Sequence, residues 1–275
     1  MRPHPWNDGF TWQDHPGPFT TITEDQAAAF DRDGFFVVED VLTPDEVART
    51  VAEIDPLEAK VESFLQTQEE GRAAIAETGA ITFTVHLAAR SAVLRELTRT
   101  PAIVGLCADL VGPDVNLYWD QAVYKKPEKP RRFPWHQDNG YVYVEPQQYL
   151  TCWVALTDAT VDNGCPHVVP GLHRSGTIVH HYVDPLGFEC LSDPAGAVAA
   201  PVGAGGVVVF SSLTPHLTGP NTTDAVRKAY NLQYAPMGAQ MMRGNPAEGE
   251  PVSVEACDDP TRQFPVLRGG APVTA

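Results

Sequence analysis

The sequence predicts an α+β domain, with helices in the first 110 residues and short strands after them. Between residues 23 and 110, two capping boxes and apolar residues at helical spacing are typical of helices. From Val115 onward, short apolar runs alternate with Pro, Gly, Asn and Asp, as in a β-sandwich or barrel. This order favours helices that buttress one face of a sheet. A length of 275 residues and a hydrophobic content of 43% fit one domain with a sizeable core.

The helical part opens with the capping box Thr23-Glu24-Asp25-Gln26. A second box, Thr43-Pro44-Asp45-Glu46, places Pro at the first helical position. Pro56 is expected to interrupt or end the second helix, because Pro has no backbone N–H. The expected elements are a helix from Thr23 to about residue 32, a strand at 35–38, a helix from Thr43 into the fifties, renewed helical spacing at 59–77, and a helix at 91–110 with a break near Pro101.

The strand-rich part contains eight expected strands, at 115–124, 133–144, 149–158, 166–169, 177–182, 206–211, 214–218 and 227–236. Residues 171–205 are rich in Gly, Ala and Pro and are expected to form a long loop region. The predicted organisation of the single domain, 1–275, is a wrapping segment at 1–22, a mainly helical part at 23–110, a strand core at 111–240, and a tail at 241–275 that is partly disordered.

The net charge of −16 disfavours nucleic acid and anionic membranes as partners. Residues 125–132, KKPEKPRR, carry five basic residues and one acidic residue, and form either a solvated loop or a steering patch for an anionic ligand. The chain has no transmembrane-length apolar run and no signal-peptide pattern at its start, so a cytoplasmic protein is expected. Five cysteines without a CxxC pair indicate reduced thiols.

His136-Gln137-Asp138 is the most informative short motif. Residues two apart in an extended strand point to the same face, so His136 and Asp138 would lie side by side. A neutral imidazole and a carboxylate supply two members of a 2-His-1-carboxylate facial triad, which favours Fe(II) and leaves coordination positions open. Because the chain has nine histidines, a His-x-Asp pair also arises by chance, and the hypothesis needs a partner histidine.

His216, in the strand-like run VVVFSSLTPHLTG, is the candidate third ligand, with a purely structural histidine as the alternative. Arg227 follows eleven residues later, at the start of the predicted strand RKAYNLQYAP. A hairpin through 219–225 would turn Arg227 toward the same cavity. A buried guanidinium needs a carboxylate partner, and its bidentate fork suits a dicarboxylate. A surface arginine at a strand start is the alternative.

The combination of HQD, a distal histidine and an arginine eleven residues later resembles the phytanoyl-CoA dioxygenase family of Fe(II)- and 2-oxoglutarate-dependent oxygenases. The resemblance covers about residues 23–236. Further motifs that carry it are GFFVV at 34–38, WVAL at 153–156 followed by Asp158, NGC at 163–165 and PGLH at 170–173, where the family often has Ser in place of Leu172. The resemblance implies a double-stranded β-helix core of the jelly-roll, cupin-like type.

The resemblance also implies which residues hold the cofactors. The implied iron ligands, which form the catalytic centre, are His136, Asp138 and His216, and Arg227 is the implied partner of the distal carboxylate of 2-oxoglutarate. Three weaker matches, for which a core or strand-surface role is the alternative, are Thr218 as a hydroxyl donor to that carboxylate, Trp153 as an aromatic beside the cosubstrate, and Gln121 as a 2-oxoglutarate contact.

The implied reaction uses Fe(II), 2-oxoglutarate and O2, hydroxylates a C–H bond of a small organic substrate, and releases succinate and CO2. Asp138 favours hydroxylation, since related halogenases lack this carboxylate; desaturation, ring closure and epoxidation stay open. The candidate substrate-binding residues, with packing as the alternative role, are Phe83, His86, Asn139 and Tyr141. Two rival hypotheses are another cupin-like metalloenzyme, such as an isomerase or a zinc hydrolase, and a non-enzymatic protein that binds metal or 2-oxoglutarate.

Overall fold

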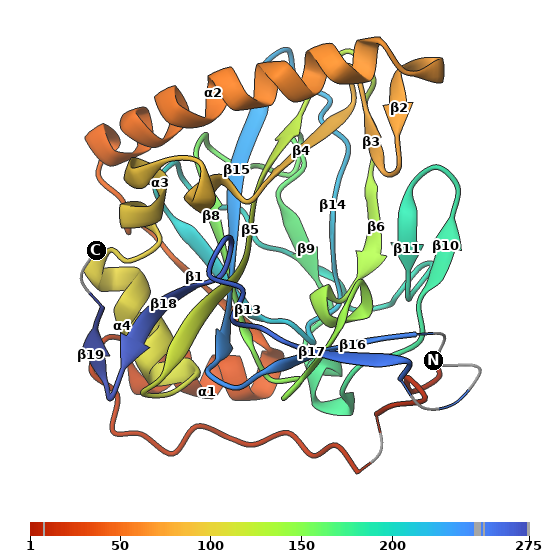
Figure 1. Ribbon diagram of the computed structural model, residues 1–275. Helices are drawn as coiled ribbons and strands as arrows, with labels where there is room; N and C mark the ends of the chain where they lie inside the picture. Colours follow the sequence, from red (N-terminus) through yellow and green to blue (C-terminus); the bar gives the residue numbers. More distant parts are fainter. Residues whose placement is uncertain (8, 245–248, 250, 274–275) are drawn as a thin grey trace.

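Two antiparallel sheets face each other and form the body of the molecule (Figure 1). The computed structural model describes residues 1–7, 9–244, 249 and 251–273. The ten-stranded sheet comprises β1 (Phe35–Val38), β13 (Val207–Ser211), β8 (Leu150–Ala155), β15 (Arg227–Pro236), β5 (Val115–Lys125), β4 (Ile81–Val85), β3 (Ala76–Glu77) and β2 (Arg72–Ala73), with β18 (Phe264–Arg268) paired to β5 and to β19 (Ala271–Pro272). The four-stranded sheet comprises β12 (Val198–Ala199), β9 (Pro166–Val168), β14 (His216–Thr218) and β6 (Phe133–His136).

Smaller sheets and helices cover this body. β17 (Ser253–Ala256), β16 (Gln240–Arg243) and β7 (Tyr143–Glu145) form a three-stranded sheet, and β10 (His181–Val183) pairs with β11 (Gly187–Glu189). The helices are α1 (Glu24–Asp33), α2 (Pro44–Gln66), α3 (Ala92–Leu97) and α4 (Pro101–Leu110). Short 3-10 turns occupy Glu69–Gly71, Leu87–Ala89, Asp138–Gly140 and Leu172–Ser175. In the described parts of the chain, no helix is long and apolar enough to cross a membrane.

The central strands of the large sheet divide their side chains between its two faces, because successive residues of a strand point to opposite sides. On β15, Tyr230, Leu232 and Tyr234 belong to the main hydrophobic cluster, which also contains residues of all four helices. Ala229, one position away, packs instead with Trp153 and Phe210 in a second cluster. The face turned away from the helices therefore lines the space between the two sheets, where the candidate site residues lie.

The structure confirms both capping boxes, in which Thr23 and Thr43 exchange hydrogen bonds with the residues three positions later. It also confirms the break at Pro101. The prediction that Pro56 interrupts or ends the second helix is wrong, because α2 continues through it to Gln66. Buried residues on both sides of Pro56, Ile54 and Leu65 among them, anchor the helix across the missing hydrogen bond.

Three other expectations from the sequence fail, and the expectation for the tail is not tested. The expected helical spacing at 59–77 ends at Gln66, after which Glu70 adopts a φ of 54° and the chain enters β2 and β3. The prediction missed β4 altogether. The loop region 171–205 contains a short hairpin and β12. The tail, expected to be partly disordered, contributes β16–β19, and β18 pairs with β5; its residues 245–248, 250, 274 and 275 lie outside the described residues.

The basic segment 125–132 does not present unpaired positive charge, so its interpretation as a steering patch is wrong. Ion pairs join Lys126 to Glu58 at 2.8 Å, Lys129 to Glu77 at 3.4 Å, Arg131 to Glu77 at 2.9 Å, and Arg132 to Glu189 at 2.5 Å. The fifth cation, Lys125, is buried, and its Nζ donates to the backbone carbonyls of Arg131, Thr218 and Gly219. These ion pairs therefore hold segment 125–132 against α2, β3 and β11.

Candidate metal centre and adjoining cavity

His136, Asp138 and His216 meet between the two sheets. His136 ends β6, His216 begins β14, and the two residues are direct partners in the antiparallel ladder. Gln137 is extended, with φ −103° and ψ 143°, so Asp138 returns to the side of His136, as the motif predicted. The Nε2 atoms of both histidines lie 3.9 Å from Asp138 Oδ1, and the candidate ligand atoms all lie within 4.8 Å of one another.

Both histidines are held in the tautomer that a metal ligand needs. His136 Nδ1 lies 2.9 Å from the carbonyl oxygen of Pro134, and His216 Nδ1 lies 3.0 Å from that of Thr214. A carbonyl oxygen only accepts, so each Nδ1–H donates and each Nε2 keeps its lone pair. Backbone carbonyls in this role fix the ring orientation of metal-binding histidines.

Asp138 is oriented by a neighbour on the opposite sheet. Thr151 Oγ1 of β8 donates to Asp138 Oδ2 at 2.5 Å, which leaves Oδ1 turned toward the two imidazoles. Between the ligands, the Gln137 side chain donates to the carbonyls of Gly176 and Leu213 and fixes the loop. His180 Nε2 accepts a hydrogen bond from the Gln137 backbone N–H at 2.9 Å.

Burial shifts the pKa values of His136 and Asp138. Burial lowers the pKa of His136 well below its ordinary value, and the neighbouring His216 lowers it further, so the imidazole is neutral. Burial raises the pKa of the Asp138 carboxyl, against which the His216 ring and hydrogen bonds from Thr151 and Gln233 act. A divalent cation among these groups would reverse the cost of the carboxylate charge. Two imidazoles and one carboxylate on one side of a site suit a metal with open coordination positions.

Arg227 at the start of β15 is the least satisfied charged group of the interior. Its side chain is 1% exposed, and Nη1 donates to the Val123 carbonyl at 3.2 Å. Among the described residues, the buried Nε and Nη2 have no hydrogen-bond partner. Burial lowers the pKa of the guanidinium to about 9. Since unpaired buried charges are costly, the two free donors indicate that an anionic ligand completes this site.

Two of the weaker matches are Trp153, which contacts Arg227, and Thr218, which shares a strand with His216. The guanidinium carbon of Arg227 lies 5.0 Å from the centre of the Trp153 ring, and Trp153 packs in one cluster with Phe210. The Phe210 ring is in turn 4.5 Å from His216. Thr218 follows His216 by two residues on β14 and is therefore on the same face of that strand. Gln121 lies elsewhere, in the wall of the cavity described next.

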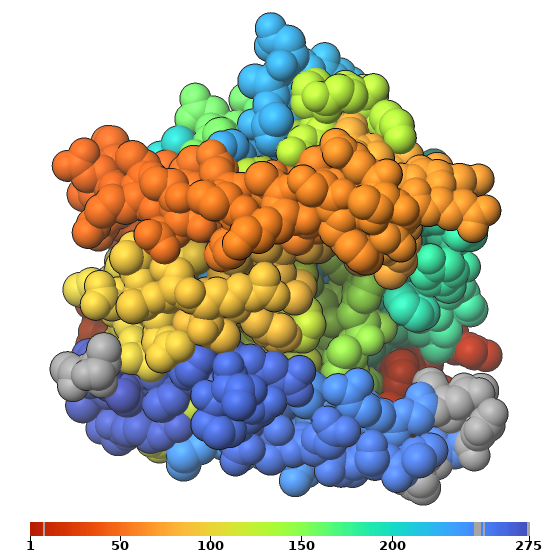
Figure 2. Space-filling view, turned by 45° about the horizontal axis from the view of Figure 1, so that its top comes forward, coloured from red at the N-terminus to blue at the C-terminus, as the bar shows by residue number. Residues whose placement is uncertain are grey.

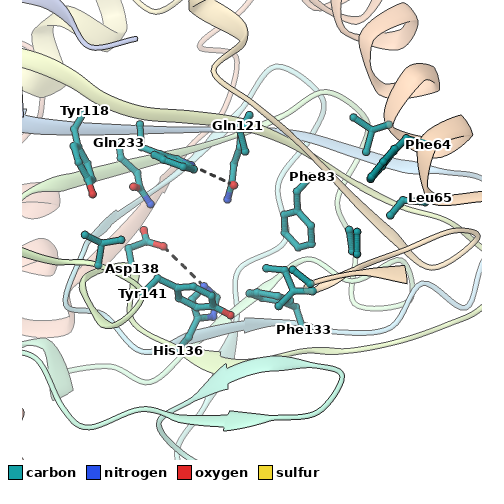
Figure 3. A pocket seen from close by; sticks show the side chains of 18 of the residues that line it. Phe64, Leu65, Phe83, Tyr118, Gln121, Phe133, His136, Asp138, Tyr141 and Gln233 are labelled. Carbon is teal, nitrogen blue, oxygen red and sulfur yellow. Dashed lines mark hydrogen bonds and ion pairs between the residues drawn. The ribbon is translucent and has the colours of Figure 1, made fainter. Parts of the chain in front are cut away.

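A cavity of about 450 Å³ adjoins the metal centre, with His136 and Asp138 in its wall. The C-terminal turns of α2, residues 73–76, and strands β4 to β6 surround it, and Figure 3 shows Phe83 and Phe133 beside the ligands. In the space-filling view, α2 (orange) runs as a ridge across the molecule above α3 and α4 (yellow) and the C-terminal strands (blue) (Figure 2). The end of this ridge, including Phe64 and Leu65, forms one side of the cavity.

The four candidate substrate-binding residues separate into two pairs. Phe83 and Tyr141 line the cavity. His86 is outside its wall and lies against the Trp119 ring, at a centroid distance of 4.4 Å. Asn139 is also outside, because its side chain bonds the backbone N–H of Val144 and the hydroxyl of Thr177. The structure thus gives His86 and Asn139 supporting positions rather than places in this cavity.

Sequence reasoning missed Thr151, Gln233 and His180, which contact Asp138 or the loop that carries it. Strand alternation offered a signal for two of them, because Thr151 precedes Trp153 by two residues and Gln233 follows Arg227 by six. His180 had no such signal, since it approaches from the loop region after residue 171.

The comparisons with known proteins agree with this geometry. Residues 30–229 match the family model for phytanoyl-CoA dioxygenase (PhyH). The ectoine dioxygenase of Bordetella bronchiseptica is 28% identical over 241 residues, which cover 78% of this chain and 76% of that protein. Phytanoyl-CoA dioxygenase domain-containing protein 1 of Mus musculus is 28% identical over 259 residues, which cover 77% of this chain and 89% of that protein.

Two solved structures extend the comparison to the fold. EvdO2 from Micromonospora carbonacea var. aurantiaca, complexed with 2-oxoglutarate, has a TM-score of 0.61 and 28% identity, covering 79% of this chain and 92% of that one. The epimerase SnoN, in complex with Fe3+, alpha ketoglutarate and nogalamycin RO, has a TM-score of 0.66 and 26% identity, covering 92% of this chain and 95% of that one.

The fold and the site together define a jelly-roll protein with an oxygenase-type metal centre. The chain belongs to the phytanoyl-CoA dioxygenase family. The family resemblance, the α+β class and the double-stranded β-helix core predicted from the sequence are confirmed.

Proposed function

We propose that this protein is an Fe(II)- and 2-oxoglutarate-dependent dioxygenase that hydroxylates an unactivated C–H bond of a small organic substrate and releases succinate and CO2. The observation that carries the proposal is an open His-Asp-His set combined with a buried Arg227 that has two unpaired donors. Iron, 2-oxoglutarate and O2 supply the oxidising power for C–H cleavage. The family and its iron- and 2-oxoglutarate-bound relatives support this cofactor set.

The chain's own residues would hold iron on one face. His136 and His216 present Nε2 while their Nδ1–H groups stay bound to backbone carbonyls. Asp138 presents Oδ1 while Thr151 holds Oδ2. The opposite face of the metal is left for the cosubstrate and for O2, next to the cavity that His136 and Asp138 border.

Arg227 would bind the distal carboxylate of 2-oxoglutarate through Nε and Nη2, the two nitrogens without partners. Trp153, against the guanidinium, would pack beside the cosubstrate, and the Thr218 hydroxyl would add a hydrogen bond to the same carboxylate. Gln121 would lie at the boundary between cosubstrate and substrate, because it lines the adjoining cavity.

Hydroxylation is proposed as the outcome because Asp138 occupies the carboxylate position of the facial set. An open position in its place would admit a further anion. Relatives of this fold include an epimerase and a dioxygenase, so the same centre supports several outcomes after C–H cleavage. The way the substrate is held then decides among them.

The proposal is tested by adding Fe(II) and 2-oxoglutarate to the protein without oxygen. We expect a visible metal-to-ligand charge-transfer band that His216→Ala abolishes. The control His181→Ala, at an exposed histidine of β10, should keep it. Folded wild-type protein without the band would refute the proposal. Succinate release that rises with an added substrate would exclude a binding protein, and dependence on 2-oxoglutarate would exclude a zinc hydrolase or an isomerase that works without a cosubstrate.

A further inference from the structure

The wall of the cavity beside the metal centre has an unusual composition for an enzyme that must orient a substrate. None of the described residues in this wall is Lys, Arg or Glu, and the one Asp is the ligand Asp138. Apart from the ligands, its polar side chains are two glutamines, three tyrosines and a tryptophan. The remaining wall is aliphatic or phenylalanine, contributed by α2, residues 73–76, strands β4 and β6, and Val142.

Aromatic rings give the cavity flat surfaces. The Phe83 and Phe133 rings lie 5.5 Å apart, and the Phe133 and Tyr141 rings are stacked at 6.1 Å with an interplanar angle of 22°. Tyr141 also meets the ligand ring of His136 edge-on at 5.3 Å. Figure 3 shows these side chains around the space above His136 and Asp138. Flat apolar walls complement a planar or fused-ring molecule, because rings stack face to face or edge to face.

Three cations on segments beside the cavity are already engaged by other groups. Lys126 and Arg131 pair with Glu58 and Glu77, and the Lys125 ammonium is held by carbonyls. An anionic group carried into the cavity would therefore lose its water without gaining a cationic partner from the wall. A volume of about 450 Å³ is in the range of pockets for small organic ligands.

From these observations, we infer that the substrate is a neutral, largely apolar ring compound, with no carboxylate, phosphate or acidic carrier in the part that enters the cavity. This inference rests on the proposed function, because it treats the cavity beside the metal ligands as the substrate site. Phe83, Phe133 and Tyr141 are its specificity-determining walls. Gln121 would bind one carbonyl or hydroxyl of the ring system: its Oε1 accepts from Trp119 Nε1 at 3.2 Å, and its amide nitrogen points to the cavity (Figure 3).

Binding to the metal-free protein tests the inference without any catalytic step. The probes are a matched pair, 9-anthracenemethanol and 9-anthracenecarboxylate, followed by the fluorescence anisotropy of the ring. We expect the neutral alcohol to bind about tenfold or more tightly than the carboxylate, since only the carboxylate pays an uncompensated desolvation cost. Equal or tighter binding of the carboxylate, or binding of neither probe, would overturn the inference.

Arginine substitutions test whether the preference for the neutral probe arises in the cavity. Val85→Arg places a cation in the cavity wall, and Phe64→Arg places one at its edge, where Phe64 is 54% exposed and the helix tolerates arginine. Both should narrow or invert the preference for the alcohol. The control Val161→Arg adds the same charge at a 56% exposed position outside the cavity and should leave the preference unchanged. A preference that responds to Val161→Arg as much as to Phe64→Arg would show that the ring binds elsewhere.

The two proposals fail separately. The charge-transfer band needs iron and 2-oxoglutarate but no ring compound, while the anthracene titration needs neither iron nor 2-oxoglutarate. A band together with preferred binding of the carboxylate would overturn only the substrate class. Preferred binding of the alcohol without a band would overturn only the dioxygenase assignment.

Discussion

Arg227→Met should remove 2-oxoglutarate binding at almost no cost to the stability of the cosubstrate-free protein. This is an uncommon expectation for a fully buried arginine. It follows from the two guanidinium nitrogens, Nε and Nη2, which have no partner in the part of the chain that the structure describes. Methionine fills a similar length of space without a charge, so the substitution separates the charge of Arg227 from its packing.

The magnitude follows from three opposing contributions. Burial lowers the pKa of Arg227 from 12.5 to about 9, which corresponds to a cost of roughly 5 kcal/mol for the charged form. The hydrogen bond to the Val123 carbonyl offsets about 1.5–3 kcal/mol of this, and the contact with Trp153 offsets about 2 kcal/mol. These contributions nearly cancel, so Arg227→Met should change the free energy of unfolding by less than about 2 kcal/mol.

In contrast to stability, the affinity of the Arg227→Met variant for 2-oxoglutarate should fall strongly. Loss of two charge-assisted hydrogen bonds at about 1.5–3 kcal/mol each should raise the Kd for 2-oxoglutarate roughly 10²- to 10⁴-fold. Urea denaturation without cosubstrate measures the first quantity, and the 2-oxoglutarate-dependent rise in Tm of the anaerobic iron-loaded protein measures the second. Arg90→Met, at an exposed arginine, is the control and should alter neither. A destabilisation of ~3–5 kcal/mol without cosubstrate would refute the reasoning, because it is the cost of breaking a satisfied buried pair.

Three further predictions concern single side chains. Thr151→Val should weaken Fe(II) binding about 10- to 100-fold in a direct titration by freeing Asp138 Oδ2, whereas Thr151→Ser should bind normally. Thr43→Ala, which removes the N-cap of α2, should lower the free energy of unfolding in urea by about 1 kcal/mol; an unchanged value would show that the cap is dispensable. Burial raises the pKa of Asp120, so its contribution to stability is present below the ordinary carboxyl pKa and is lost as pH rises through the raised value. Wild type should therefore lose stability relative to Asp120→Asn over that range, and parallel pH profiles of the two proteins would contradict this.

The sequence predicted the metal centre well because its geometry is local. His136 and Asp138 flank one extended residue, and this spacing alone places them on one face. The partner His216 lies far along the chain, and its place depends on the pairing of β14 with β6. Its strand-like surroundings made it a candidate ligand, but only the family resemblance selected that role over a structural one, because spacing carries no information on which strands become neighbours.

The wrong predictions in the helical part arose where the structure depends on contacts that are distant in the sequence. Local rules predicted that Pro56 would end or interrupt a helix, but burial of the residues on either side keeps α2 continuous. β4 was missed because its residues follow a run of helical spacing, and its strand conformation depends on pairing with β5. In both places tertiary packing overrides local propensity.

The inner face of β15 explains why the sequence predicted the cosubstrate anchor better than the wall of the substrate cavity. Arg227 pairs across the sheet with Lys125, Asn231 with Gln121, and Gln233 with Trp119. Along one strand, the inward side chains thus pass from the proposed cosubstrate anchor to the wall of the apolar cavity, while the outward ones form the helix-packed core. The anchor end has a chemical requirement that a sequence motif can express, namely a charge for a dicarboxylate. The cavity end is set by residues of α2, 73–76 and β4, which lie outside the metal-binding motif and were the least well predicted part of the chain. If the cavity is the substrate site, as inferred above, the residues that select the substrate lie on segments separate from those that hold the metal and the cosubstrate.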